Sequence, residues 1–546
     1  MRHLCLSEIM AEECISYNYA EYIIRKWEVG AAKLNTFSSL FLADRNEAYK
    51  LLEAIIGVQH AMNHHVKLST TSRKLVGAQE LMQIAMHRLR YEFSAILSAT
   101  RSSNLDSESL NSQDRDRETT ATESERAVED LKSVAECMIA CGYAKECVGT
   151  YRIVRKSIVD ETMYYLGIER LRNSELRNME WRNLETRINT WLRVVKIAVQ
   201  NLFKREKIIC DAVFSSSEKV AEACFAAIST DAAADLFSFA ESLCKCKKVL
   251  SPEKIFRLLD LYEVISDLWP DIELLFADKL SSEVRSQAAM AQLKLGETVS
   301  AMLGQFEEAI RKETSPPPIG GGVHPLTRYM MNFLVVLGDY DAALSSILED
   351  WSPANVRSTP TKNRFSSHAS GGEADASAPE ISRRLSWLIV ILLCKLDGKT
   401  AAYDDVALSY LYLANNLNYV VSKVRSSNLG ILIGEDWIGK HELNVKAYLT
   451  KYEKIGWSDV TSAATPPAEV AESVELYYAG FHETCRKQRS WVIPDPIIRE
   501  EVKISLRKRI LSGYRVLCKR MNNMPDVIVR YTPQELDNYL SNLFQE

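Results

Sequence analysis

Two short motifs that could support catalysis are incomplete in this sequence. Gly398 to Thr400 resembles the end of a phosphate-binding loop, but the first glycine of that loop would stand at position 393, which is Leu393. His441-Glu442 begins the HExxH motif of a metalloprotease, yet the second histidine is replaced by Val445. The Gly-x-Ser-x-Gly turn of serine hydrolases is absent from the sequence. We therefore predict that the protein is not an enzyme.

The cysteines do not form a metal-binding pattern. The sequence has 12 Cys but no CxxC motif, and the closest groupings are Cys244 with Cys246 and Cys137 with Cys141. A structural zinc site needs four ligands at workable spacing. We therefore expect no metal and no cofactor, and reduced thiols in a cytosolic protein.

Positive charge gathers near the carboxyl end. From Arg486 to Arg530 there are twelve Lys and Arg against four Asp and Glu, a local balance of +8 in a chain whose formal net charge is -5. A basic region on an acidic chain indicates an anionic partner at that end. Nucleic acid is the poorer partner, because the known recognition modules are absent and the sequence pI is about 6.1. Anionic membrane and a solvated surface without a partner remain as alternatives.

Two helices must position this charge. Asp495-Pro496 is typical of an N-cap followed by Pro at the first helical position, and an apolar stripe follows it at three- to four-residue spacing. The stripe consists of Ile498, Val502, Leu506, Ile510, Tyr514 and Leu517. Thr532 to Glu535 has the form of a capping box, which predicts a last helix that buries Leu536, Tyr539, Leu540, Leu543 and Phe544.

Seven basic residues at this end are the candidate contacts to an anionic surface, and most of them fall outside the apolar stripe. They are Lys503, Arg507, Lys508, Arg515, Lys519, Arg520 and Arg530. We expect the first six to act together and Arg530 to be the most important single residue.

The longest apolar run, from Leu385 to Cys394, is about half of the roughly 20 residues that span a bilayer. The amino-terminal segment carries Glu8, Glu12 and Glu13 where a signal peptide is apolar. Any membrane contact is therefore predicted to be peripheral.

The rest of the chain predicts an all-α fold. We expect a helical segment at 1–97, a disordered linker at 98–127, a helical bundle at 128–187 and a helical region at 188–546 with polar loops near 313–323, 352–380 and 458–468. The stripe from Leu75 to Ile96 either packs against its neighbours or pairs with a helix of another chain. A second stripe, from Val406 to Val424, favours tight antiparallel packing of long helices.

Longer blocks of sequence resemble a known family. They are Lys74 to Val76, Ala78-Gln79, Leu81 to Met86, Gly142-Tyr143, Glu146-Cys147, Tyr151, Met179 to Trp181, Gly322 to Tyr329, Lys395 to Lys399, Leu413 to Leu417, Trp491 and Pro494-Asp495. On these blocks the chain resembles the seventy-kilodalton subunit of the exocyst complex, in its land-plant branch. The blocks are far more specific than a short motif, because they are long and occur in order.

The resemblance implies an elongated rod of stacked antiparallel helical bundles that helps to tether secretory vesicles to the plasma membrane during exocytosis. It implies a cytoplasmic protein that is peripheral at the plasma membrane. The implied partners are other exocyst subunits, in part through the amino-terminal helices, anionic phosphoinositide lipids and small GTPases of the Rho class. The alternative is a diverged helical scaffold that acts outside the complex, in regulation or immune signalling.

The chain departs from the family at one position that bears on lipid binding. The resemblance places a basic pair around a Tyr-Ile step just before the final helix, in contact with phosphoinositide. Here that stretch is Val527 to Arg530, so that Val527 replaces the first basic residue and Arg530 keeps the second charge.

Overall fold

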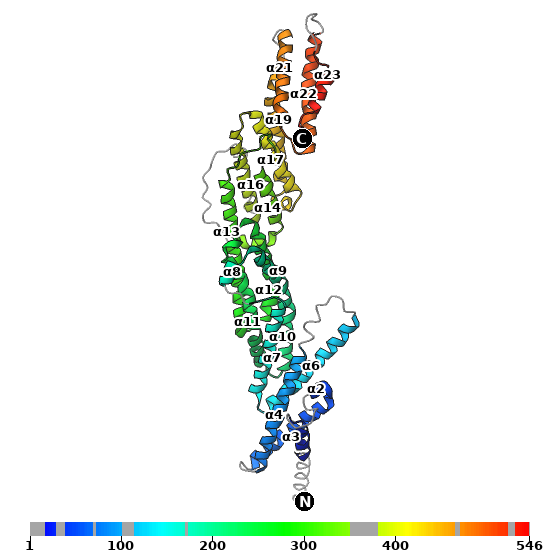
Figure 1. The fold of residues 1–546 in the computed structure, drawn as a ribbon, viewed down its shortest axis with the longest axis vertical. Coiled ribbons are helices and arrows are strands. Elements are labelled where there is room, and N and C mark those ends of the chain that lie inside the picture. Colours follow the sequence, from blue (N-terminus) through cyan, green and yellow to red (C-terminus); the bar gives the residue numbers. More distant parts are fainter. Residues whose placement is uncertain are drawn as a thin grey trace. The chain divides into compact units, whose positions relative to one another are not determined.

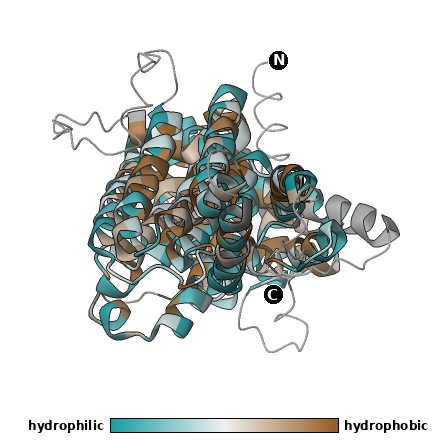
Figure 2. Ribbon diagram, turned by 90° about the horizontal axis from the view of Figure 1, so that it is seen from above, coloured by the Kyte–Doolittle hydropathy of each residue, from teal (hydrophilic) through white to brown (hydrophobic). Residues whose placement is uncertain are grey.

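The computed structural model describes residues 17–28, 39–68, 73–100, 114–169, 173–349, 380–464, 470–521 and 530–544. Every regular element in these residues is a helix, and they contain no strand (Figure 1). The helices carry hydrophobic residues on one side and hydrophilic residues on the other, as Figure 2 shows. The predicted all-α class is confirmed.

The chain forms two compact units. The first comprises Met1–Leu250 and Asp260–Gly296, and the second comprises Ser251–Leu259 and Glu297–Glu546. Two long helices, α12 (Ile255–Leu275) and α13 (Ser282–Lys312), contribute residues to both units. The predicted boundary at 187/188 falls inside α9 (Trp181–Ile197), so the helix continues across it.

The first unit begins with a helical stretch at residues 17–26. Its remaining elements are α2 (Leu40–Ala43), α3 (Arg45–Leu68), α4 (Arg73–Ala99), α6 (Asp114–Ala140), α7 (Ala144–Tyr165), α8 (Asn173–Asn178), the π-helix η2 (Ala198–Phe203), α10 (Lys204–Val213), α11 (Glu218–Cys244), and the 3-10 turns η3 (Lys247–Val249) and η5 (Lys279–Ser281). Helices α9, η2 and α10 follow one another without a break.

The second unit holds the carboxyl-terminal helices. Its elements are η4 (Pro252–Lys254), α14 (Pro325–Gly338), α15 (Asp341–Glu349), α16 (Glu380–Lys399), η6 (Thr400–Ala402), α17 (Val406–Arg425), α18 (Leu429–Ile433), α19 (Glu435–Gly456), α20 (Ser458–Ala463), α21 (Val470–Gln488), α22 (Pro496–Met521) and α23 (Pro533–Ser541).

The apolar stripe of α4 is buried within the chain itself. The seven residues of the stripe are buried, namely Leu75, Ala78, Met82, Ala85, Leu89, Phe93 and Ile96. Helix α4 packs against α3, α6 and α7. The stripe therefore belongs to the core of the first unit, and of the two alternatives the structure supports packing against neighbours. Burial of this kind, rather than helix propensity, supplies most of a helix's stability.

Buried polar groups also tie the first unit together. The Glu92 carboxylate on α4 pairs with Arg88 at 2.5 Å and accepts hydrogen bonds from the Ser39 hydroxyl at 2.6 Å and from the Leu40 backbone N–H. On α7, Arg155 donates to Glu206 of α10 at 2.9 Å and to Thr100 at 2.9 Å. Such buried charges remain stable only because each has its partner.

The predicted loops and linker agree with the structure only in part. Residues 313–324 are non-helical between α13 and α14, where a loop near 313–323 was predicted. The predicted disordered linker is wrong for residues 114–127, because α6 begins at Asp114. The predicted loop near 458–468 is wrong at its start, where Ser458–Ala463 forms α20 and buries Val460. Nearly all of 352–380 lies outside the described residues.

Asparagines of α17 hold the loop before α14 in place. The Asn415 side chain donates to the carbonyl oxygens of Gly321 and Val492, both at 2.8 Å. The Asn416 side-chain oxygen accepts from the His324 backbone N–H at 2.9 Å. A Cβ on Gly320 would lie 2.5 Å from the Ser490 carbonyl oxygen, so close approach requires glycine there. Gly320 therefore serves packing of this loop against the segment before α22.

Helix α17 packs against α19, as the heptad-like spacing predicted. Leu413, Leu417, Val420 and Val424 are buried, whereas Val406 at the start of the stripe is exposed.

Helix α11 is long and apolar enough to cross a membrane by length and composition, and the bent pair of α14 and α15 passes the same test. In the structure α11 packs against α7 and α10 and buries residues along its length, as the core helix of a folded unit does.

Candidate functional site: the basic face of helix α22

Helix α22 begins where the sequence predicted. The Asp495 carboxylate accepts hydrogen bonds from the backbone N–H groups of Ile497 at 2.9 Å and Ile498 at 3.1 Å, and Pro496 is the first helical residue. An aspartate at this position satisfies N–H groups that have no partner within the helix. The cap fixes the start of the helix and therefore the direction in which its faces point.

One face of α22 packs against α20, α21 and α23. Five residues of the predicted stripe, Val502, Leu506, Ile510, Tyr514 and Leu517, are buried, while Ile498 is half-buried. The Tyr514 hydroxyl is hydrogen-bonded to the Tyr478 hydroxyl at 2.8 Å, and burial raises the pKa of Tyr514. The opposite face is left to solvent.

Three of the predicted basic residues share that solvent face. Lys508, Arg515 and Lys519 are exposed. At 100° per residue they lie within about 40° of one another around the helix, over roughly 16 Å of its length. We call Lys508, Arg515 and Lys519 the basic face. Their charges point in one direction from one rigid element.

Exposed apolar side chains flank the basic face. Ile504 is 60% exposed and Val516 is 52% exposed. The predicted site did not include these two residues, although their positions outside the buried stripe indicate that they are exposed. Arg509, also exposed and also missed, lies to one side of the three. Basic and apolar groups side by side on one helix are typical of surfaces that bind at a membrane interface.

The other predicted basic residues are not equivalent to the basic face. Lys503 is only 8% exposed, and its ammonium lies 3.4 Å from the Glu500 carboxylate. Its inclusion in the candidate site is therefore corrected, because it lies in the packed interface of α22. Arg520 is half-buried, and one of its terminal nitrogens is buried without a hydrogen bond among the described residues.

Arg507 joins α22 to the final helix. Its guanidinium pairs with the Asp537 carboxylate of α23, with one N–H donating at 2.6 Å. This hydrogen-bonded pair raises the pKa of Arg507. A cation held by a carboxylate presents little net charge to a distant anion. Arg507 therefore positions α23 more than it extends the basic face.

Helix α23 begins with the predicted capping box. The Thr532 hydroxyl accepts from the Glu535 N–H at 3.3 Å, and the Glu535 carboxylate accepts from the Thr532 N–H at 2.7 Å, which lowers the pKa of Glu535. Leu536, Leu540, Leu543 and Phe544 are buried as predicted. Tyr539 is exposed instead, which corrects that part of the prediction.

Arg530 precedes α23 in an aromatic setting. Its backbone N–H donates to the Tyr478 hydroxyl at 3.1 Å, and its guanidinium carbon lies 5.7 Å from the centre of the Tyr478 ring. The guanidinium also pairs with Glu475 at 3.2 Å, where both side chains are exposed. An exposed pair of this kind is weak and exchangeable. Val527 lies outside the described residues.

The described residues contain no group of three or more His, Cys, Asp and Glu that could hold a metal ion. The basic face offers ammonium and guanidinium donors. Its chemistry is therefore electrostatic attraction and hydrogen bonding to an anion such as a phosphate.

Comparisons with known proteins identify both parts of the chain. Residues 189–542 match the family model of the C-terminal part of Exo70, an exocyst complex component, and residues 17–99 match the model of its N-terminal part. The first match covers more than half of the chain, and it includes the whole of α22 and α23.

Curated relatives and a solved structure agree with these matches. Exocyst complex component EXO70A1 of Arabidopsis thaliana is 28% identical over 442 residues, which are 76% of this chain and 66% of that relative. EXO70B2 of the same plant is 28% identical over 499 residues, which are 86% of this chain and 80% of that relative. The crystal structure of the S. cerevisiae exocyst component Exo70p covers 97% of this chain and 98% of its own at a TM-score of 0.61 and 16% identity, and so shares the fold. The chain belongs to the Exo70 family of exocyst complex subunits.

Proposed function

We propose that this chain acts as an exocyst subunit that helps to tether secretory vesicles to the plasma membrane, and that the basic face of α22 contacts anionic phosphoinositide lipids. The family match supports the subunit role and agrees with the prediction that the chain is not an enzyme. The observation that carries the lipid contact is the grouping of Lys508, Arg515 and Lys519 on one exposed face, flanked by Ile504 and Val516.

The free energy available from these charges makes the lipid contact weak by itself. Each basic residue near an anionic leaflet contributes about 1 kcal/mol, and the attraction falls off within a Debye length of about 8 Å. The basic face together with Arg530 therefore supplies roughly 4 kcal/mol. That free energy corresponds to a Kd of about 1 mM. Insertion of Ile504 and Val516 adds to it, but a lasting contact needs several weak sites in one assembly.

The proposed partners follow from the family. They are other exocyst subunits and small GTPases of the Rho class, and the proposed location is the cytoplasm with peripheral contact to the plasma membrane. The stripe of α4 is already buried by α3, α6 and α7, so an assembly contact in the first unit would use other surfaces. Affinity purification from native cytosol tests the subunit role. Recovery of no other exocyst subunit would favour the alternative, a helical scaffold in regulation or immune signalling.

Cosedimentation with vesicles tests the lipid contact. The full chain is mixed with phosphatidylcholine vesicles that contain phosphatidylinositol 4,5-bisphosphate, or phosphatidylserine at equal total charge. The triple variant Lys508→Glu, Arg515→Glu, Lys519→Glu removes three attractions of about 1 kcal/mol each, so its binding should fall by at least about 100-fold. Binding of the unchanged chain should weaken as salt rises, because screening shortens the range of the attraction.

A matched triple variant provides the control. Lys440, Lys446 and Lys454 are exposed on α19 of the same unit, so Lys440→Glu, Lys446→Glu, Lys454→Glu makes the same change in net charge on another helix. It should leave most of the binding intact. Equal loss in both triples would mean that net charge alone drives binding. If vesicle binding changes neither in the two triple variants nor with salt concentration, the basic face is solvated surface without a lipid partner.

A further inference from the structure

The loop between α13 and α14 presents an accessible serine that is followed by proline. Thr314, Ser315 and Pro316 are exposed and non-helical. One class of protein kinases selects a serine or threonine in this setting, because proline fixes the backbone after the acceptor and has no N–H that would need a partner. The hydroxyl of Ser315 is therefore open to such an enzyme without unfolding of a helix.

Other prolines that follow a hydroxyl residue in the described part of the chain have a local explanation. Pro252 follows Ser251 at the first position of η4, and Pro533 follows Thr532 at the first position of α23. Proline is favoured there because the first helical N–H has no partner within the helix. Residues 316–324 are not helical, so this explanation does not apply to the proline after Ser315.

The loop holds this serine at a fixed place. Beyond it, the Tyr403 hydroxyl donates to the carbonyl oxygen of Pro318, and the Val492 backbone N–H donates to that of Gly320 at 2.9 Å. Before it, the Glu313 carboxylate accepts from the Ser315 backbone N–H at 2.8 Å and from its hydroxyl. Ser315 thus keeps a defined position relative to the helices around it.

A buried histidine directs a donor at the serine hydroxyl. The His324 ring is fully buried, and its Nδ1 accepts from the Leu326 N–H at 3.0 Å. The neutral ring therefore carries its proton on Nε2. That nitrogen lies 3.4 Å from the hydroxyl oxygen of Ser315. An anion attached to this oxygen would find one hydrogen-bond donor already in place.

Two lysines of α16 supply positive charge beside the same serine. The Lys399 ammonium donates to the Ser315 carbonyl oxygen and pairs with Glu313 at 2.8 Å, and its side chain is only 8% exposed. The Lys395 ammonium donates to the carbonyl oxygen of Arg311 at 2.7 Å. A rigid, largely buried ammonium attracts an anion more strongly than an ammonium in open solvent does.

There is room for an additional anionic group next to these lysines. Ser315, Lys395 and Lys399 together line a cavity of about 720 Å³ between the loop and the end of α16. Gly398 lies in the same lining, and a Cβ on it would meet nothing within 4 Å. A phosphate group on Ser315 could therefore turn into the cavity without displacing a helix.

We propose that Ser315 is a phosphorylation site and that Lys399 and Lys395 hold its phosphate in this cavity. In the transfer, the Ser315 Oγ forms a bond to the γ-phosphorus of ATP, the bond from that phosphorus to its bridging oxygen breaks, and ADP leaves. The hydroxyl proton passes to the catalytic carboxylate of the kinase, which supplies ATP and the base. The product carries a charge of about -1.5 to -2 at pH 7 and three acceptor oxygens.

The phosphate replaces Glu313 as the partner of Lys399. The two anions repel each other, and the phosphate has the greater charge and more acceptor oxygens. The exchange takes place where α13, the start of α14 and the end of α16 meet, and His324 connects it to the first N–H groups of α14. It involves no residue of α22, so this modification is independent of the proposed lipid contact.

Phosphorus NMR on the full chain with phosphoserine placed at position 315 tests the binding of the phosphate. The second pKa of a phosphoserine is about 6. Two neighbouring ammonium groups should lower this pKa to about 5. Phosphoserine placed instead at position 216, an exposed serine in the turn after α10, is the control and should titrate near its usual value.

Variants of the two lysines identify the groups that hold the phosphate. Lys395→Met should return part of the pKa shift, and it leaves the Lys399–Glu313 pair in place. The double variant Lys399→Met, Glu313→Gln removes both charges of that pair, so that no charge is left buried alone, and should return most of the shift. Equal pKa values at positions 315 and 216, or a shift that survives both variants, would overturn the proposed phosphate site.

Incubation of the folded full chain with ATP and a proline-directed kinase tests access to the serine. A mitogen-activated protein kinase and a cyclin-dependent kinase are used in turn, and site-resolved mass spectrometry measures the phosphate on Ser315. Pro316→Ala keeps the hydroxyl and should lose most of this phosphate, whereas Thr314→Ala should keep it. Absence of phosphate on Ser315 with both kinases, or equal labelling of the Pro316→Ala variant, would contradict the proposal.

Discussion

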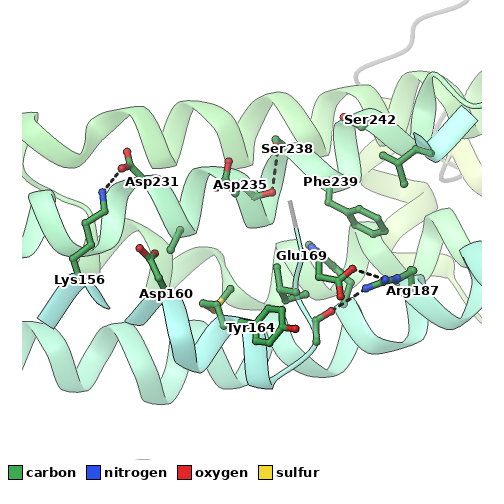
Figure 3. Close-up of a pocket in the computed structure, with 16 residues that line it drawn as sticks. Lys156, Asp160, Tyr164, Glu169, Arg187, Asp231, Asp235, Ser238, Phe239 and Ser242 are labelled. Carbon is green, nitrogen blue, oxygen red and sulfur yellow. Dashed lines mark hydrogen bonds and ion pairs between the residues drawn. The ribbon is translucent and has the colours of Figure 1, made fainter. Parts of the chain in front are cut away.

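The basic face of α22 and a cavity of about 630 Å³ in the first unit, lined by α7, α8, α9 and α11, place charged side chains in different ways (Figure 3). The basic face carries positive charge on one helix, from Lys508 to Lys519. The cavity draws its lining from residues as far apart as Lys156 and Ser242, and it places carboxylates beside cations in ion pairs such as Lys156–Asp231 and Glu169–Arg187. A charged helix face needs only its own helix to fold with the correct side outward. A cavity exists only after several helices have packed, so its lining is part of the core.

The largest expected effect tests whether Trp191, which lines the cavity, also belongs to the hydrophobic core of the first unit. Trp191→Ala removes a large buried side chain and its hydrogen bond to the Leu236 carbonyl, so it should lower the free energy of unfolding by about 3–5 kcal/mol. Urea denaturation followed by circular dichroism measures it. Lys508→Ala, an exposed change on the basic face, is the matched comparison and should cost within about 0.5 kcal/mol. Similar costs for both would erase the distinction between the regions.

The next effect distinguishes exposed from buried cations on α22. Lys508→Glu should weaken vesicle binding by about 2 kcal/mol, because it removes one attraction and adds one repulsion of about 1 kcal/mol each. Lys503→Met should leave vesicle binding unchanged, since the Lys503 side chain is packed against the protein and its ammonium is paired with Glu500. Cosedimentation at fixed salt compares the two. Equal losses would mean that α22 exposes another face when it binds.

A smaller gain should follow from placing a basic residue at position 527, where the resemblance to the family implies one. Val527→Lys would add a basic residue near Arg530, worth about 1 kcal/mol at an anionic leaflet, or about fivefold in affinity. Vesicle flotation with and without phosphoinositide measures the gain. Val527→Gln introduces a polar side chain of similar length without charge and should give no such gain. No difference between the two variants would place this stretch away from the lipid surface.

The smallest effect is a pH dependence in the second unit that neither charged region explains. His324 is fully buried, its ring Nδ1 accepts from the Leu326 N–H at 3.0 Å, and burial together with Lys399 lowers its pKa below 6.5. The unfolded chain therefore binds a proton at higher pH than the folded chain does. This histidine should cost stability progressively as pH falls below about 6.5, and should cost nothing well above that value.

The variant His324→Asn isolates this pH effect, because asparagine can also accept the N–H at the start of α14 without titrating. Urea midpoints at pH 7.5 and 5.5 should differ less in the variant than in the unchanged chain. A shift of the same size in both chains would show that other groups, such as the nearby Glu313, cause the pH dependence.

Local sequence rules were enough to predict helix starts at the carboxyl end. Asp495-Pro496 and Thr532 to Glu535 form the predicted caps, because a cap depends on a few neighbouring residues. The buried stripe of α22 was predicted for the same reason, since helical periodicity places its residues on one side. Periodicity failed for residues 114–127, where a polar segment forms the first part of α6.

The sequence by itself determined the all-α class, the caps of α22 and α23, the loop before α14 and the excess of positive charge near the carboxyl end. Each of these depends on residue types within one helix or one turn. Only the tertiary structure decided that Lys503 is buried, that Arg507 is held by Asp537, and that Asp160 and Asp235 lie in one cavity. The physical reason is that exposure and pairing depend on which helices pack together, and residues far apart in sequence become neighbours only through that packing.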